Sequence, residues 1–170
     1  DIVTLLIKQN ALVHALDADG NSPLHWAAEY DHSDIADSLI DEDPSLVHLE
    51  NAAGETPLDI ACQWENIETV KVLLQHGASV GNTLNDAIEA NNTDLVQVLS
   101  KYTKLDGETL ENLLDFSKSQ DASDCYMYFK SLKNKDRKEN LQSKERKRWS
   151  LTNAITKLGR KPKSSRNNSN

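Results

Sequence analysis

Gly20-Asn21-Ser22-Pro23-Leu24 and Gly54-Glu55-Thr56-Pro57-Leu58 are two copies of one pattern, separated by an offset of 34 residues. In each copy the glycine can take the positive φ of a tight turn. The hydroxyl residue can accept from the free amides of a helix start, and the proline fits the first helical position because no donor is lost there. The pattern therefore predicts a turn followed by a short helix, over about residues 24–29 and 58–63.

The alignment extends over residues 1–104. At the same offset Ala27 falls on Ala61, and Ala61 falls on Ala87 at a further offset of 26 residues. The apolar spacing within residues 67–74 predicts a second helix for each unit. Such self-similarity indicates a repeat architecture. We predict an incomplete first unit, two well-formed units and a third unit that has lost its glycine turn.

Two stretches resemble a known family. Ser22-Pro23-Leu24-His25-Trp26-Ala27-Ala28 is similar to the Thr-Pro-Leu-His-x-Ala-Ala signature of ankyrin repeats, and residues 66–78 resemble the second helix and exit turn of that family. The resemblance covers about residues 1–104. It implies an all-α solenoid of stacked helix–turn–helix units, with projecting turns and a concave binding face. Asp59 departs from the family because histidine is usual there, which places one turn-stabilising hydrogen bond in question.

The rest of the chain divides into two segments. Residues 105–132 revive the turn pattern and carry apolar residues at helical spacing, so we predict a degenerate capping helix pair, since a solenoid needs an end unit that tolerates water. An unrelated helical hairpin is the alternative. Residues 133–170 hold 13 Lys or Arg against 3 Asp or Glu, whereas residues 1–104 hold 4 against 18. The charge asymmetry predicts a basic tail that is partly helical and disordered over residues 159–170.

Composition excludes several function classes. Six glycines argue against a turn-dense all-β fold, and the two cysteines stand far apart in no metal-like spacing. His25 belongs to the repeat motif, the other four histidines fall at turn and linker positions, and no glycine-rich phosphate loop is present. We therefore predict no catalytic residue, no cofactor and no metal site. The chain begins at Asp1, so we expect further sequence upstream.

The resemblance also implies which residues contact a partner: those at the turn tips and late on the inner helices. Carried over, they are Asp19, Asn21, Glu29, Tyr30, Glu55, Gln63, Trp64 and Glu89. Tyr30 and Trp64 share one repeat position, so we expect them side by side on the concave face, as aromatic anchors in an acidic groove. Such a groove suits a basic or mixed-charge protein segment. In the alternatives, Trp64 packs on a neighbouring helix and the acidic surface is only solvated. Trp26 is predicted to lie in the core.

The tail carries a second pattern. Leu151, Ala154, Ile155 and Leu158 are spaced as one apolar helical stripe, and Arg146, Lys147 and Arg148 precede it. A basic amphipathic helix can dock on an anionic membrane or a partner groove, and a basic cluster can bind nucleic acid or act as a nuclear address. A solvated, partly helical tail is the alternative. The opposite charges also suggest an intramolecular contact between the tail and the acidic repeats.

We thus predict a non-catalytic protein–protein interaction module that binds a partner protein on the concave face of its repeats. One alternative is an accessory ankyrin region of a larger enzyme or secreted effector whose catalytic domain lies upstream. Another is a membrane or nucleic-acid adaptor driven by the tail. A cytoplasmic location is expected, with the nucleus, or the host-cell cytosol for a secreted effector, as alternatives.

Overall fold

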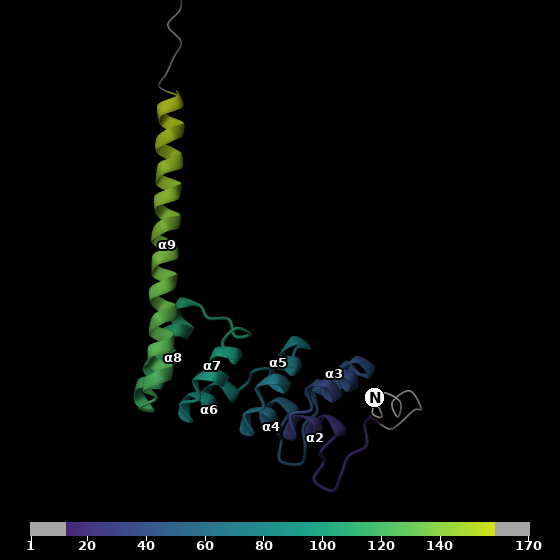
Figure 1. Cartoon of the computed structure of the whole chain (residues 1–170). Helices are drawn as coiled ribbons and strands as arrows, with labels where there is room; N and C mark the ends of the chain where they lie inside the picture. The colour runs from purple at the N-terminus through teal and green to yellow at the C-terminus, as the bar shows by residue number, and fades with distance from the viewer. Residues whose placement is uncertain (1–12, 159–170) are drawn as a thin grey trace, which may run out of the picture. The chain divides into compact units, whose positions relative to one another are not determined.

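The chain is a succession of helix pairs (Figure 1). A computed structural model describes the backbone over residues 13–158 and the side chains over residues 13–150. The helices are α2 (Pro23–Glu29), α3 (Ser33–Glu42), the 3-10 helix η1 (Pro44–His48), α4 (Pro57–Gln63), α5 (Ile67–Gln75), α6 (Thr83–Glu89), α7 (Thr93–Leu99), α8 (Gly107–Ser119) and α9 (Ser123–Leu158). Residues 13–158 contain no strand. The predicted all-α solenoid is confirmed, while the incomplete first unit falls mostly outside the described residues.

The helices form two rows. Figure 1 shows the inner helices α2, α4 and α6 in one row and the outer helices α3, α5 and α7 in the other. Two loops project at the start of α2 and α4, where the glycine turns were predicted. Gly20 and Gly54 have φ values of 78° and 80°, and prolines open both helices. We call the two loops, residues 17–21 and 51–55, the first and second finger.

The turn between inner and outer helix is the same in four units. Its central residue has a φ between 50° and 56° and is never glycine. The next residue's N–H donates to a carbonyl five residues back, at 2.9 Å in every unit. The four central residues are Asp31, Glu65, Asn91 and Asp121. Helix α8 and the start of α9 therefore form a fourth helix pair with the turn of the other three.

Side chains of these turns also join one unit to the next. Asp31 Oδ1 accepts from the backbone N–H of Thr69 at 3.3 Å and from its Oγ1 at 2.9 Å, near the start of the next outer helix. Asn91 Oδ1 accepts in the same way from the N–H of Cys125, at 3.3 Å, near the start of α9. The fourth unit is thus attached by the contact that joins the first two full units.

The core is aliphatic and repeats with the units. Inner helices contribute a leucine and a small residue to it, and outer helices contribute mainly leucine and valine. Three repeat positions are buried in all four units. The first holds Leu24, Leu58, Leu84 and Leu114, the second holds Ala27, Ala61, Ala87 and Ser117, and the third holds Leu39, Leu73, Leu99 and Phe129. Small side chains on the inner row allow neighbouring helices to approach closely.

The prediction that Trp26 lies in the core is wrong. Its side chain is 42% exposed. Helix α2 has only seven residues, and its buried stripe is Leu24, His25, Ala27 and Ala28. Position 26 lies off that stripe because successive residues are about 100° apart around a helix.

The chain divides into two compact units between Phe129 and Lys130. In the second unit the helix continues to Leu158, and every side chain from residue 134 to residue 150 is exposed. Side chains beyond residue 150, including the predicted stripe of Leu151, Ile155 and Leu158, lie outside the described part, as does the backbone of residues 159–170. Within residues 13–158, no helix is both long and apolar enough to cross a membrane.

Candidate partner-binding surface

The two fingers have the same internal structure. Asp17 and Asn51 occupy one repeat position, and each donates its backbone N–H to the carbonyl four residues on, Asn21 O at 3.1 Å and Glu55 O at 2.9 Å. Each also accepts backbone N–H bonds through its side-chain Oδ1, from 2.8 to 3.0 Å. A short polar side chain at this position folds the turn back on itself, as Asx turns do.

The fingers are bonded to each other. The Ala52 N–H donates to Asp19 O at 3.0 Å, and Asn51 Nδ2 donates to Asn21 Oδ1, also at 3.0 Å. The predicted contact residues Asp19 and Asn21 therefore lie on a rigid edge formed by both fingers.

His25 links the first inner helix to the second finger. Its Nδ1 accepts from the Ser22 N–H at 3.1 Å, so the ring proton is on Nε2, which donates to Glu55 O at 3.1 Å. Asp59, at the same repeat position, accepts from Thr56 N and Oγ1 at 2.7 Å and closes the capping box within its own unit. In the described residues it makes no bond to the next unit, which has no finger. The missing histidine thus leaves helix capping intact.

We expect His25 to make folding dependent on pH. Burial lowers its pKa from the ordinary value of 6.5, which disfavours the protonated ring in the folded state. The unfolded chain then binds more protons just below that value, so stability is fully present above about pH 6.5 and falls as the pH drops. Urea unfolding between about pH 5.5 and 7.5 should show this slope, and His25→Gln should flatten it. The exposed His48→Gln should retain it, and an unchanged slope in His25→Gln would refute the assignment.

The Glu55 carboxylate is held by two side-chain hydrogen bonds. Its Oε1 accepts from Gln63 Nε2 at 2.7 Å and its Oε2 from Asn51 Nδ2 at 3.0 Å. These bonds, that of Asn51 first, lower the pKa of Glu55. Glu55 and Gln63, two predicted contact residues, are therefore held together with the carboxylate ionised.

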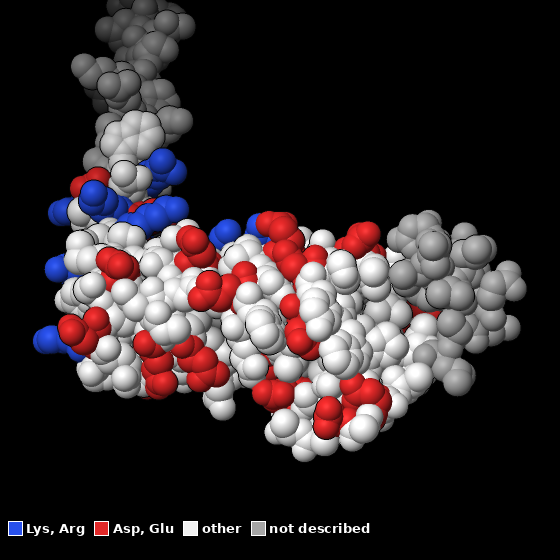
Figure 2. Space-filling view, turned by 60° about the horizontal axis from the view of Figure 1, so that its bottom comes forward, with Lys and Arg blue, Asp and Glu red and all other residues white. Residues whose placement is uncertain are grey.

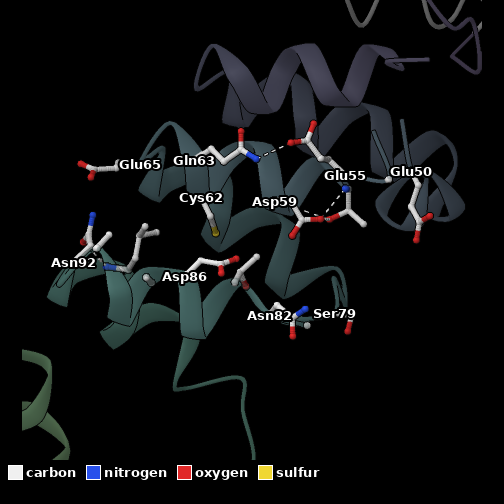
Figure 3. A pocket seen from close by; sticks show the side chains of 17 residues that line it. Glu50, Glu55, Asp59, Cys62, Gln63, Glu65, Ser79, Asn82, Asp86 and Asn92 are labelled. Carbon is white, nitrogen blue, oxygen red and sulfur yellow. Dashed lines mark hydrogen bonds between the residues drawn. The ribbon is translucent and has the colours of Figure 1, made fainter. Parts of the chain in front are cut away.

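A groove of about 620 Å³ opens between the second and third units (Figure 3). Helix α4 forms one wall of the groove and α6 forms the other. The third unit has no finger, so the space between these two helices stays open. No lysine or arginine lines it. The carboxylates that line it are Glu50, Glu55, Asp59, Glu65 and Asp86. Of the predicted contact residues, Glu55 and Gln63 line this groove, and its other four carboxylates were not predicted to contact a partner.

A second groove of about 460 Å³ lies beside the fingers, and Asp19, Asn21, Glu29 and Glu55 are among its lining residues. Glu89 and Trp64 line neither of the grooves described.

Residues 13–100 contain 17 Asp or Glu but one lysine and no arginine. Many carboxylates and few cations are accordingly visible on the array in Figure 2. The field over this surface attracts cations.

Cys62 lies at the bottom of the larger groove (Figure 3). Its side chain is partly buried. Burial, reinforced by the charge of Asp59, raises the pKa of the thiol to about 12. The thiolate is the nucleophilic form of cysteine, so at neutral pH this side chain is an unreactive wall of the groove.

Tyr30 and Trp64 follow the ends of α2 and α4, and each is 59% exposed. The ring that stacks on Tyr30 is Trp26, with centroids 6.0 Å apart and planes 6° from parallel. Within the described residues no ring contact joins Tyr30 to Trp64. Tyr30 and Trp64 are therefore two separate exposed aromatic residues. The stack of Tyr30 on Trp26 was not predicted from the sequence.

The basic cluster Arg146, Lys147 and Arg148 belongs to the second unit, where all three side chains are exposed on α9.

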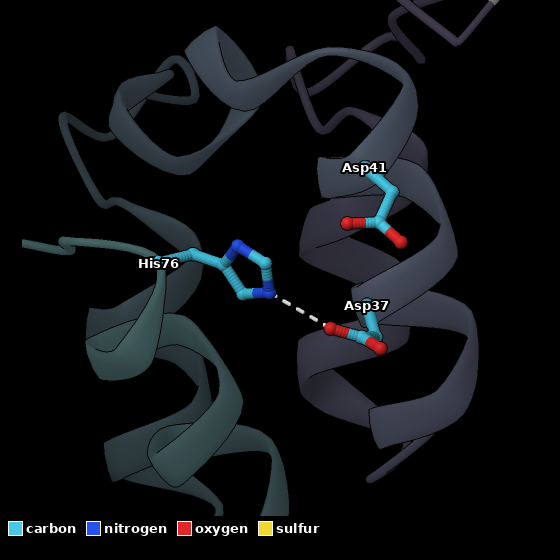
Figure 4. A group of neighbouring side chains, drawn as sticks. All are labelled: Asp37, Asp41 and His76. Carbon is cyan, nitrogen blue, oxygen red and sulfur yellow. Dashed lines mark hydrogen bonds and ion pairs between the residues drawn. The ribbon is translucent and has the colours of Figure 1, made fainter.

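One group in the described part has the composition of metal ligands. Asp37 and Asp41 of α3 and His76 at the end of α5 have ligand atoms within 4.8 Å of one another (Figure 4). All three are exposed, and His76 Nε2 lies 2.8 Å from Asp37 Oδ1 as an ion pair or hydrogen bond. Exposed acidic groups often lie close together without an ion, so this cluster gives no metal assignment.

Comparison with known proteins identifies the repeats. A family model described as ankyrin repeats (3 copies) matches residues 1–83. None of the curated proteins matches the chain.

Proposed function

Since the chain is an ankyrin-repeat-containing protein, and such repeats are generally protein–protein interaction modules, we propose that it binds a partner protein. The binding surface is the exposed part of the two fingers and of α2, α4 and α6, here called the inner-helix surface. The partner presents a basic or mixed-charge segment, and the module itself is non-catalytic.

The groove between the second and third units is the observation that carries this proposal. It holds five carboxylates and no lysine or arginine. Asn51 and Gln63 already orient Glu55, so the partner does not bear the entropic cost of ordering that side chain. A segment with basic residues complements such a surface, and complementary charge raises the association rate and the selectivity.

The exposed aromatics provide the apolar part of the surface. Trp64 is 59% exposed at the edge of α4, and tryptophan and tyrosine are enriched among the residues that dominate interface energies. Charges at the rim of an interface contribute mainly to the association rate. We therefore assign the larger share of the binding energy to the aromatic anchors.

We expect Trp64→Ala to weaken binding of the partner by about 2 kcal/mol, or roughly 30-fold, as for an interface hot spot. Its exposure implies little effect on folding, so thermal unfolding should stay close to that of the wild type. Calorimetric titration with the partner measures the loss. A folded variant of unchanged affinity would remove Trp64 from the binding surface.

The test of the proposal is quantitative affinity capture with three baits. These are the wild type, the double variant Tyr30→Ala/Trp64→Ala, and the double variant Glu68→Ala/Lys71→Ala. The last pair forms a 2.7 Å ion pair on the outer helix α5 and serves as the matched control. At least one protein should be retained by the wild type and the control and lost from the aromatic double variant. Identical recovery on all three baits would contradict the proposal.

A further inference from the structure

We infer that Trp26 and Tyr30 form a subsite for the guanidinium group of an arginine, supplied by the basic segment of the partner. The inference rests on the proposed function and deepens it, because it assigns one side-chain chemistry to one place on the inner-helix surface.

The subsite is an exposed aromatic platform. Trp26 is 42% and Tyr30 59% exposed, four residues apart along α2 and its end, with their rings 6° from parallel. Other units do not repeat the pair, because the residues at the two positions are Ile60 and Trp64, Asp86 and Ala90, and Phe116 and Gln120. Two large aromatic side chains are thus left in contact with water at one place on the array.

The first finger fixes the orientation of the platform. The indole Nε1 of Trp26 donates to Asp17 Oδ2 at 3.1 Å. The other oxygen of Asp17 accepts from the backbone N–H groups of Asp19 and Asn21, at 2.9 and 2.8 Å. The bond from Asn21 is the largest of the effects that lower the pKa of Asp17, so the carboxylate is ionised at neutral pH. The edge of the indole ring is therefore bonded to the Asp17 carboxylate, which the backbone of the first finger fixes in place.

The charges around the platform select a cation as its occupant. Lys71 is the only lysine or arginine in residues 13–100, and it pairs with Glu68 on an outer helix. The faces of aromatic rings attract cations, most strongly for tryptophan. An apolar occupant would bring no charge to this acidic surface and would strip water from the Asp17 carboxylate, which is costly.

Arginine fits better than lysine. A guanidinium is planar, stacks on aromatic faces and is more weakly hydrated than an ammonium group. It also carries five N–H donors in its own plane. It can therefore lie flat on the exposed face of one ring, with its charge attracted by the nearby Asp17 carboxylate.

The probes are short glycine–serine peptides that carry arginine, lysine or citrulline at the same positions, titrated at about 0.15 M ionic strength. The chain has three tryptophans, Trp26, Trp64 and Trp149, so three indole N–H signals report by NMR. The arginine peptide should shift the Trp26 signal more than the other two. Trp26→Leu, which keeps apolar bulk, should weaken its binding about threefold to fivefold, and Trp149→Leu, the matched control at an exposed tryptophan of α9, should leave it unchanged. The lysine peptide should bind more weakly, and the uncharged citrulline peptide should leave the Trp26 signal in place.

Two results would overturn the inference. One is an unmoved Trp26 signal in the wild-type protein, a measurement that needs no variant to fold. The other is equal affinity of the arginine peptide for the wild type and Trp26→Leu. Either would leave the proposed function standing, because that function is tested separately by capture on the Tyr30→Ala/Trp64→Ala bait.

Discussion

Replacing Phe129 by alanine should lower the free energy of unfolding of the array by about 3 to 5 kcal/mol. Phe129 is fully buried and occupies, in the fourth unit, the position of Leu39, Leu73 and Leu99. Its removal leaves a cavity and exposes the end of the core that the fourth helix pair covers. Because each repeat contacts only its neighbours, loss of an end unit weakens the unit beside it as well. Urea unfolding followed by circular dichroism measures the effect.

Met127 provides the control. It lies two residues away on the same helix and is 59% exposed, so Met127→Ala should change stability by no more than about 0.5 kcal/mol. Equal effects of the two substitutions would contradict the assignment of the fourth helix pair to the cooperative core.

The second large effect is expected at Gly20. Its φ is +78°, and a Cβ there would lie 2.9 Å from the backbone nitrogen of Ala52. That nitrogen donates to Asp19 O, so Gly20→Ala forces the fingers apart as well as imposing the cost of positive φ. A positive φ costs about 1 to 2 kcal/mol and each lost hydrogen bond about 1 kcal/mol, so a total of about 3 kcal/mol is expected.

A substitution at Gly54 measures the cost of the positive φ alone. Its φ is +80°, but a Cβ there would meet nothing within 4 Å. Gly54→Ala should therefore cost only about 1 to 2 kcal/mol. The difference between the two variants, measured by urea unfolding, reports the finger-to-finger contact. Identical losses would show that this contact adds nothing to stability.

The fold could be predicted from the sequence because its signals are local. The glycine turn, the hydroxyl residue and the proline lie within five consecutive residues, and Gly20 and Gly54 have the positive φ that the pattern implied. The turns at Asp31, Glu65, Asn91 and Asp121 were harder to recognise, since a positive φ is uncommon in residues other than glycine. The spacing of these four turns identifies the fourth unit, but the turns themselves can be recognised only from the backbone conformation.

The surface was less predictable because it depends on contacts between units. The carboxylates expected to form an acidic groove were Asp19, Glu29, Glu55 and Glu89. Of these only Glu55 lines the groove between the second and third units, which Asp86 joins because the third unit lacks a finger. The exposure of Trp26 follows from a helix of seven residues whose buried stripe is already filled by leucine, histidine and alanine. The partner of that indole is Asp17, nine residues earlier in the chain, and no periodic pattern connects the two.

The central claim is that a partner protein docks on the inner-helix surface. Site-specific photo-crosslinking tests it most directly, with the photoreactive residue placed in turn at four exposed positions. Ala53 and Ala90 lie on a finger and beside the large groove, whereas Asp41 and Glu68 lie on outer helices. In cells that express the chain, crosslinks to one partner should form from Ala53 and Ala90 and not from Asp41 or Glu68. Crosslinks confined to Asp41 and Glu68, or equal from all four positions, would contradict the account.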